Sequence, residues 1–198
     1  KSPLSFLFSI LFLPLSILYW LITCCLRFLH ERIRPSSLLL KEQSLPVIVV
    51  GNISVGGTGK TPIIINLAKQ LIEAGFQPAI ISRGYGGIAS ASKNSVTPVF
   101  SDSDPGYCGE EPVLIAQSLK NVPVIIAASR ASAYLPVANP LASKVVPIHD
   151  GLQHYQLPRS IEIAVIDSKQ GLGNGLLIPS GPLRERVSRL KQVDHIVV

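Results

Sequence analysis

The segment from Ser54 to Thr61, SVGGTGKT, combines residue types and a spacing that suit the binding of phosphate. Its glycines carry no Cβ, so the peptide N–H groups around them can turn inward on an anion. Lys60 supplies a positive charge for the β- and γ-phosphates of a nucleotide, and the Thr61 hydroxyl suits Mg²⁺. The sequence therefore predicts a site for a nucleoside triphosphate. The predicted cofactor-binding residues are Ser54, Val55, Gly56, Gly57, Thr58, Gly59, Lys60 and Thr61.

The flanks of this segment place it between a strand and a helix. Val47 to Val50 form a continuous apolar run, which is typical of a strand covered on both faces. A long apolar helical pattern follows, with Pro62 in its first turn, where a missing N–H costs nothing. The usual motif has glycine where Ser54 stands, so the match fails by one residue. The strand and the helix nevertheless supply the context that a phosphate-binding loop requires.

The rest of the chain alternates apolar strand-like runs with helical segments. Further strands are predicted at 78–82, 123–127, 144–148 and 161–166, with a last one at the C-terminal end. Helices are predicted at 110–119, from 130 to about 137, and from about 183 to 191. The Ser-rich stretch 87–109 is predicted to be a mobile loop. This order indicates an α/β fold, a P-loop NTPase-like parallel sheet with helices on both faces.

Carboxylates stand where the strands of such a sheet end, which is where ligands bind. Asp150 follows the fourth predicted strand, the position at which a P-loop protein holds Mg²⁺ together with the loop hydroxyl, here Thr61. An Asp before a Gly is also a common turn pair without any metal. Glu110 and Glu111 begin a helix, where they complement its dipole; one of them is also a candidate general base or metal ligand. The predicted catalytic residues are Glu110, Asp150 and Lys60, and the predicted metal ligands are Thr61, Asp150 and Glu111.

Other polar residues at the strand ends are candidates for contact with an acceptor. Arg83 and Arg130 suit an anionic group, although each also fits an ordinary solvated surface charge. His149 and His154 suit a hydroxyl or phosphate, although a single loop histidine is more often polar filling. So many polar clusters at one edge of the sheet favour an enzyme over a simple binding module.

The N-terminal segment has the composition of a membrane anchor. No charged residue occurs from Ser2 to Leu26, and Tyr19 and Trp20 precede a basic flank that includes Arg27. A signal peptide is the competing interpretation, but no small-residue cleavage site follows. Pro3 and Pro14 leave a spanning helix and an interfacial helix as alternatives. The net charge of +6 then indicates a membrane surface rather than nucleic acid.

Three regions follow from these patterns. Residues 1–34 are predicted to form the membrane anchor with its basic flank, 35–45 a linker, and 46–198 the P-loop core. The chain has no initiating Met and stops inside an apolar, strand-like run. We therefore expect it to be the N-terminal portion of a longer protein.

Together the motifs closely resemble the tetraacyldisaccharide 4′-kinase family of the lipid A pathway. The matching blocks are PLSILYW, VGNISVGGTGKTP, SRGYGG, GEEPVLIA, DGLQHYQL and GNGLLIPSGPLRERVSRL. The resemblance implies transfer of the ATP γ-phosphate to the 4′-hydroxyl of the lipid A disaccharide 1-phosphate, with Mg²⁺, at the cytoplasmic face of the bacterial inner membrane. It implies that Glu110 is the base beside Glu111. The residues that it implies face the acceptor are Arg83, Tyr85, Arg130, Gln153 and His154.

The sequence departs from the family pattern at two acidic positions. The family usually has Asp where Glu110 stands, and a second Asp where His149 stands. Pro147 is unusual in a central strand. The family also has a smaller C-terminal lobe with a catalytic histidine, which we expect to lie beyond Val198.

Two other functions remain open at this stage. A membrane-tethered P-loop ATPase would need no lipid acceptor, and a degenerate paralogue would bind nucleotide without turnover. The motifs SRGYGG and DGLQH favour the lipid kinase because an ATPase alone leaves them unexplained. No obligate protein partner is evident from the sequence.

Overall fold

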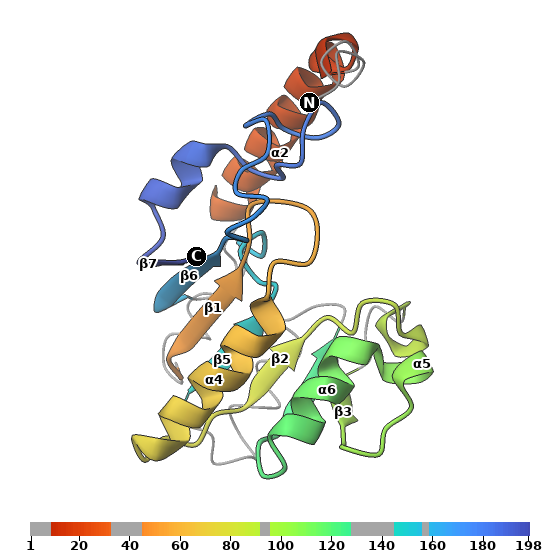
Figure 1. The fold of residues 1–198 in the computed structure, drawn as a ribbon, viewed down its shortest axis with the longest axis vertical. Coiled ribbons are helices and arrows are strands. Elements are labelled where there is room, and N and C mark those ends of the chain that lie inside the picture. The colour runs from red at the N-terminus through yellow and green to blue at the C-terminus, as the bar shows by residue number, and fades with distance from the viewer. Residues whose placement is uncertain (1–8, 33–44, 92–95, 128–144, 156–158) are drawn as a thin grey trace.

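A mixed sheet forms the centre of the protein (Figure 1). The computed structural model describes residues 9–32, 45–91, 96–127, 145–155 and 159–198. Within them the sheet has seven strands in the order β3-β4-β2-β5-β1-β6-β7. The strands are β1 (Val47–Gly51), β2 (Ile80–Ser82), β3 (Val96–Val99), β4 (Val124–Ala127), β5 (Val146–His149), β6 (Ile161–Val165) and β7 (His195–Val197). The helices are α2 (Leu13–Arg32), α4 (Lys60–Glu73), α5 (Pro105–Cys108) and α6 (Glu110–Ser118), with short 3₁₀ turns η1 (Ile88–Ala91) and η2 (Val187–Lys191).

The parallel α/β sheet predicted from the sequence is confirmed for six of these strands, and β3 is the exception. β3 pairs antiparallel with β4, in the register Val96↔Ala127 to Val99↔Val124. The prediction of a loop across 87–109 was therefore wrong, because the stretch holds β3, η1 and α5. Its many serines hide a short strand whose Pro98 is tolerated because β3 lies at the edge of the sheet.

Pro147 lies in the central strand β5 at little cost to the hydrogen-bond ladder. β5 runs between β1 and β2 and pairs with β1 along its whole length. The Val146 amide donates to the Pro46 carbonyl on the β1 side, so the nitrogen of the next residue, Pro147, faces β2. β2 and β5 share a single paired position there, Ile81↔Ile148. A missing donor on that side therefore removes few bonds.

The two faces of the sheet are covered differently. α4 and α6 pack on one face, around Ile64, Ala68 and Ile115 (Figure 1). The opposite face is covered by residues 172–192, which we call the C-terminal segment. Its side chains pack against Val47 and its neighbours through Leu172, Leu177, Leu183 and Leu190. Helices on both faces were expected; in the described part of the chain both packed helices lie on one face. The helix predicted after Arg130 lies outside the described residues.

The helix predicted over 183–191 is largely wrong. Leu183 instead forms an isolated antiparallel bridge with Ser54. The Arg184 amide donates to the Ile53 carbonyl at 2.7 Å. The backbone at Leu183 and Arg184 therefore pairs with the residues that follow β1 and does not form a helix. Only Val187 to Lys191 turns, as η2.

The N-terminal helix α2 extends from the end of the sheet beside the C-terminal segment (Figure 1). The Ser16 hydroxyl donates to the Leu177 carbonyl at 2.9 Å, and the Tyr19 hydroxyl donates to the Arg184 carbonyl at 3.1 Å. Among the described residues, no helix reaches both the length and the hydropathy of a membrane span. The spanning form of the predicted anchor is therefore without support, and residues 1–8 of that segment lie outside the described part.

Candidate active site

The predicted phosphate-binding loop connects β1 to α4. Gly59 is the N-cap of α4 with a φ of 74°, a left-handed conformation that favours glycine. Lys60 and Thr61 form the first turn, and both are buried. Gly59 itself has no side chain to cap this helix end. Its first amides are therefore available to an anion, and the helix dipole favours negative charge there.

The first two residues of the loop are tied to the C-terminal segment. The Ser54 amide donates to Asn52 Oδ1 at 3.1 Å, and the Asn52 amide group donates to Ser54 Oγ at 2.8 Å. The Val55 amide donates to the Pro182 carbonyl at 2.8 Å. Serine in place of the usual glycine thus serves as a hydrogen-bonding group that fixes the start of the loop. Because the Ser54 and Val55 amides already donate to protein acceptors, the backbone amides left to bind phosphate are those from Gly56 onward.

The rest of the loop has room and donors for a phosphate chain. A Cβ added to Gly57 or Gly59 would meet no heavy atom within 4 Å. The Thr58 hydroxyl is buried, and it has no hydrogen-bond partner among the residues that the structure describes. A buried hydroxyl without a partner is costly unless a ligand satisfies it. These features fit the triphosphate of ATP.

Asp150 lies opposite the end of this loop, as predicted. Its backbone has a φ of 54°, which is uncommon for a residue other than glycine. Its carboxylate lies 3.5 Å from Lys60 Nζ and 3.5 Å from Arg184 Nη1. Strain of this kind often marks functional positions. A hard oxygen donor beside the loop lysine fits the Mg²⁺ role expected for Asp150.

His149 is almost completely inaccessible, with 1% of its side chain exposed. Its Nε2 lies 3.3 Å from Thr61 Oγ1, and its Nδ1 lies 3.5 Å from Ser82 Oγ. Nδ1 also lies 3.7 Å from Glu111 Oε2. The histidine was expected to face an acceptor, and the structure instead places it between the loop and α6.

The two glutamates at the start of α6 face different surroundings. Glu111 lies beside His149, and burial raises the pKa of its carboxyl, with Lys60 lowering it and Asp150 raising it further. Glu110 is exposed and lines a cavity of about 470 Å³. Both glutamates line the cavity, and Glu111 is the one that the structure also brings to the predicted metal group.

Close backbone packing places Tyr85 at the same cavity. A Cβ on Gly87 would lie 2.5 Å from the Gly109 nitrogen, so only glycine permits this approach. The contact holds the SRGYGG loop against the start of α6. Tyr85, which is 79% exposed, therefore stands with Glu110 and Glu111 around the cavity. The structure brings these predicted residues together.

The other predicted acceptor residues are more scattered. Arg83 is exposed just after β2. His154 is half-buried in the turn after β5, where its amide donates to the Gly151 carbonyl. Gln153 donates to the Asn52 carbonyl at 3.0 Å and to Glu185 Oε1 at 2.7 Å. Arg130 lies outside the described residues.

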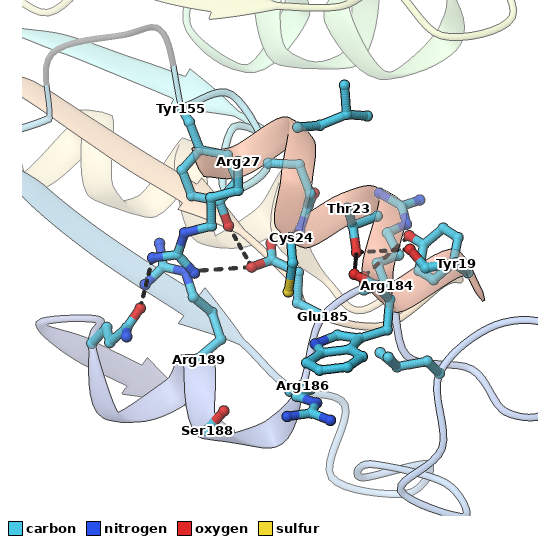
Figure 2. A pocket seen from close by; sticks show the side chains of 15 residues that line it. Tyr19, Thr23, Cys24, Arg27, Tyr155, Arg184, Glu185, Arg186, Ser188 and Arg189 are labelled. Atoms are coloured by element: carbon cyan, nitrogen blue, oxygen red, sulfur yellow. Dashed lines mark hydrogen bonds and ion pairs between the residues drawn. The ribbon is translucent and has the colours of Figure 1, made fainter. Parts of the chain in front are cut away.

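A second cavity, of about 390 Å³, opens between α2 and the C-terminal segment; Figure 2 shows it. We call it the α2 cavity. The Arg27 guanidinium lies 4.8 Å from the centre of the Tyr155 ring, and that of Arg186 lies 3.9 Å from the centre of the Trp20 ring. Its lining residues are Tyr19, Trp20, Thr23, Cys24, Leu26, Arg27, Gln153, Tyr155, Leu177, Arg184, Glu185, Arg186, Ser188, Arg189 and Gln192.

A buried polar network forms the floor of the α2 cavity. The Tyr155 hydroxyl donates to Glu185, and Arg189 Nε lies 3.5 Å from the same carboxylate (Figure 2). Below them, Arg189 Nη2 lies 2.6 Å from Glu162 Oε1. Burial, followed by the negative charge of Glu185, raises the pKa of Tyr155 to about 12. No role was predicted from the sequence for Arg184, Glu185 or Arg189. The only sequence feature that pointed to them was the run of charged residues in GPLRERVSRL. That run was interpreted as part of a basic helix rather than as part of a site.

The loop, its helix and the parallel sheet define a P-loop protein. Comparison with known proteins narrows this class. The model of the family described as tetraacyldisaccharide-1-P 4′-kinase matches residues 8–198. The chain belongs to this family, and the resemblance seen in its motifs is confirmed.

Individual relatives agree with this assignment. The chain is 48% identical over 188 residues to tetraacyldisaccharide 4′-kinase of Pasteurella multocida and 46% identical over 189 residues to that of Actinobacillus succinogenes, covering 94% of the chain in both cases. It is also similar to the crystal structure of LpxK from Aquifex aeolicus in complex with ATP, with a TM-score of 0.77 and 30% identity over 95% of the chain. The chain spans 56% and 55% of the two relatives and 57% of the solved protein.

Proposed function

We propose that the protein containing this chain transfers the γ-phosphate of ATP to the 4′-hydroxyl of a tetraacyldisaccharide 1-phosphate. The observation that carries this proposal is the convergence of the loop residue Lys60, the carboxylate of Asp150 and the two glutamates of α6 beside an open cavity. Phosphoryl transfer needs these parts: a phosphate cradle, a metal group and an acceptor site. The names of the relatives and the ATP-bound neighbour support the same reaction.

The phosphate side of the site would be formed by the loop and its surroundings. The amides from Gly56 to Thr61 would hold the phosphates, and Lys60 would offset the charge that develops on them. Thr61, Asp150 and Glu111 would hold Mg²⁺, which stabilises phosphate charge when bound. In the described residues, no group of three or more His, Cys, Asp or Glu is placed to hold a metal. Mg²⁺ commonly takes one or two carboxylates together with phosphate oxygens and water, so this set fits it.

The acceptor side of the site would be the cavity at the start of α6. Glu110 is exposed there and would accept the proton of the attacking hydroxyl. The Tyr85 ring would present its face to a sugar. Gln153 lines the α2 cavity and donates to the Asn52 carbonyl; Asn52 in turn bonds to Ser54 at the start of the phosphate-binding loop. The α2 cavity, with its arginines and aromatic rings, would take a phosphate and the adjoining part of the lipid.

The outward face of α2 supports contact with a membrane surface. Its polar residues Ser16, Tyr19 and Thr23 face the C-terminal segment. Large apolar side chains that do not line the α2 cavity are exposed elsewhere on the helix, among them Leu15, Ile17, Leu18, Leu21 and Ile22. An exposed apolar face of this extent suits an interfacial helix. We propose that it rests on the cytoplasmic side of the bacterial inner membrane, where a lipid with several acyl chains remains.

Turnover of ATP with and without the lipid separates the alternatives. The full-length protein in detergent should consume ATP much faster when tetraacyldisaccharide 1-phosphate is added. Equal ATP consumption with and without it would instead support a membrane-tethered ATPase. A degenerate paralogue would show little turnover, which a Glu110→Asp, His149→Asp double variant would raise sharply.

A further inference from the structure

His149 occupies a position from which it touches the predicted metal group without belonging to it. It is the last residue of β5, behind the first turn of α4 and beside the start of α6. One ring nitrogen, Nε2, faces Thr61 Oγ1 at 3.3 Å. The other, Nδ1, faces Ser82 Oγ at 3.5 Å and Glu111 Oε2 at 3.7 Å.

The partners of the ring determine which nitrogen carries the proton. Both neighbours of Nδ1, the Ser82 hydroxyl and the Glu111 carboxyl, have oxygens that accept hydrogen bonds, so we place the ring proton on Nδ1. Nε2 of the neutral ring then has an unshared pair, which faces Thr61. The Thr61 hydroxyl is the only donor in that contact, and it gives its proton to Nε2.

This arrangement fixes the orientation of the threonine hydroxyl. A hydroxyl has one proton and two lone pairs. When the proton points into the protein at His149, the lone pairs of Thr61 Oγ1 point away from it, toward the end of the phosphate-binding loop. We infer that His149 is a positioning residue that accepts the Thr61 proton and thereby turns the Thr61 oxygen toward the divalent cation of a bound nucleotide. This inference rests on the proposed ATP and Mg²⁺ binding.

The role also gives a physical account of a histidine at a position where the family usually has a second acid. An aspartate there would accept the same proton but would add a negative charge. A neutral imidazole supplies the acceptor without that charge, and its second nitrogen lies 3.7 Å from Glu111 Oε2. Orientation of a ligand by a hydrogen-bonded neighbour is a general feature of metal sites.

Two amide substitutions separate the two sides of the ring. In His149→Asn the side-chain amide takes the place of Nδ1 and leaves nothing at Nε2, whereas in His149→Gln the amide reaches the place of Nε2. The affinity of the full-length protein for ATP would be measured with and without Mg²⁺, and the ratio of the two is the gain due to the cation. We expect His149→Asn to lower that gain about fivefold and His149→Gln to stay within about twofold of the wild type. Affinity without Mg²⁺ should hardly change.

Coupling to Thr61 provides a second readout. Thr61→Val removes the hydroxyl, so adding His149→Asn to it should cause no further loss of the Mg²⁺ gain. An unchanged gain in His149→Asn would overturn the inference, as would an equal loss in His149→Gln. Additive losses in the double variant would also count against it.

The tautomer can be measured on the wild-type protein alone. Nitrogen NMR of the nucleotide-free protein should show Nδ1 of His149 protonated and Nε2 unprotonated. The opposite tautomer overturns the inference even where an Asn variant fails to fold. Absence of any ATP binding by the wild type would overturn the proposed function and this inference with it, whereas normal binding with a Mg²⁺ gain insensitive to His149 would overturn the inference alone.

Discussion

The Lys60 ammonium and the Asp150 carboxylate lie 3.5 Å apart, although 90 positions separate the two residues in the sequence. Arg184 approaches the other oxygen of the same carboxylate at 3.5 Å. Three segments therefore meet at Asp150: the first turn of α4, the end of β5 and the C-terminal segment that also lines the α2 cavity. Asp150 is therefore one of the residues that join the phosphate side of the site to the cavity beside α2.

Substitution of Asp150 should abolish most of the kinase activity. Asp150→Asn keeps the size of the side chain but removes its charge, so we expect kcat/KM of the full-length protein to fall about 100-fold or more. Asp102→Asn is the matched control, because Asp102 is exposed in the turn before α5 and lines neither cavity. Equal activity in the two variants would rule out a role for Asp150 in catalysis.

Glu111 should contribute to ATP turnover while its buried carboxylate lowers the free energy of unfolding at neutral pH. Burial raises its pKa above the ordinary 4.5, so the folded protein holds this proton more tightly than the unfolded chain. The free energy of unfolding therefore falls as the pH rises above 4.5 through the raised pKa. Glu111→Gln has no such group, and it should be more stable than the wild type by about 0.5 kcal/mol near pH 7, because the half-exposed side chain is partly screened.

Denaturant unfolding near pH 4 and near pH 7 measures this difference. The advantage of Glu111→Gln should grow toward the higher pH, while its ATP turnover falls. Glu73→Gln serves as the control because Glu73 is an exposed glutamate at the end of α4 that lines neither cavity. A loss of stability in Glu111→Gln at neutral pH would contradict the explanation by burial.

The phenol of Tyr155 should report on the buried network below the α2 cavity. Its pKa of about 12 arises first from burial and then from the negative charge of Glu185. In Glu185→Gln that charge is gone, so the pKa should fall toward 10 while staying above it. Phenolate absorbance, taken as the difference from Tyr155→Phe in each background, measures the shift. An unchanged pKa would show that Glu185 does not contact the phenol in solution.

Two neighbouring cysteines can test whether the lipid enters the α2 cavity. Cys24 lines the cavity, and Cys25 is exposed on the same helix without lining it. In Cys25→Ser, saturating acceptor lipid should slow labelling of Cys24 by a maleimide about fivefold, since a ligand in a pocket covers most of its walls. In Cys24→Ser the label on Cys25 should react at nearly the same rate with and without lipid. Equal protection of both thiols would indicate a general effect on α2 instead.

The parts of the structure that the sequence predicted are those with a local signal. The run Val47–Val50, the glycines of the loop and the helix after Lys60 each have a pattern within a few residues, and β1 and α4 begin close to where that pattern places them. The position of Asp150 followed from the rule that parallel strands end at one edge. These features need no knowledge of distant contacts.

The parts that were missed depend on contacts between distant segments. The Tyr19 hydroxyl bonds to the Arg184 carbonyl across 165 positions of the sequence, and the Val55 amide bonds to Pro182. No pattern within 183–191 shows that its first residues pair with the loop rather than form a helix. The α2 cavity exists only because α2 and this segment meet, so its residues could not be assigned together beforehand.

Transfer of labelled phosphate to the lipid tests the central claim most directly. The full-length protein would be incubated in detergent with radiolabelled ATP and tetraacyldisaccharide 1-phosphate, alongside a Lys60→Ala variant. We predict a labelled lipid, phosphorylated at the 4′ position, from the wild type and at least about 100-fold less from the variant. Absence of labelled lipid from a wild-type protein that still binds ATP would contradict the assignment as a lipid kinase.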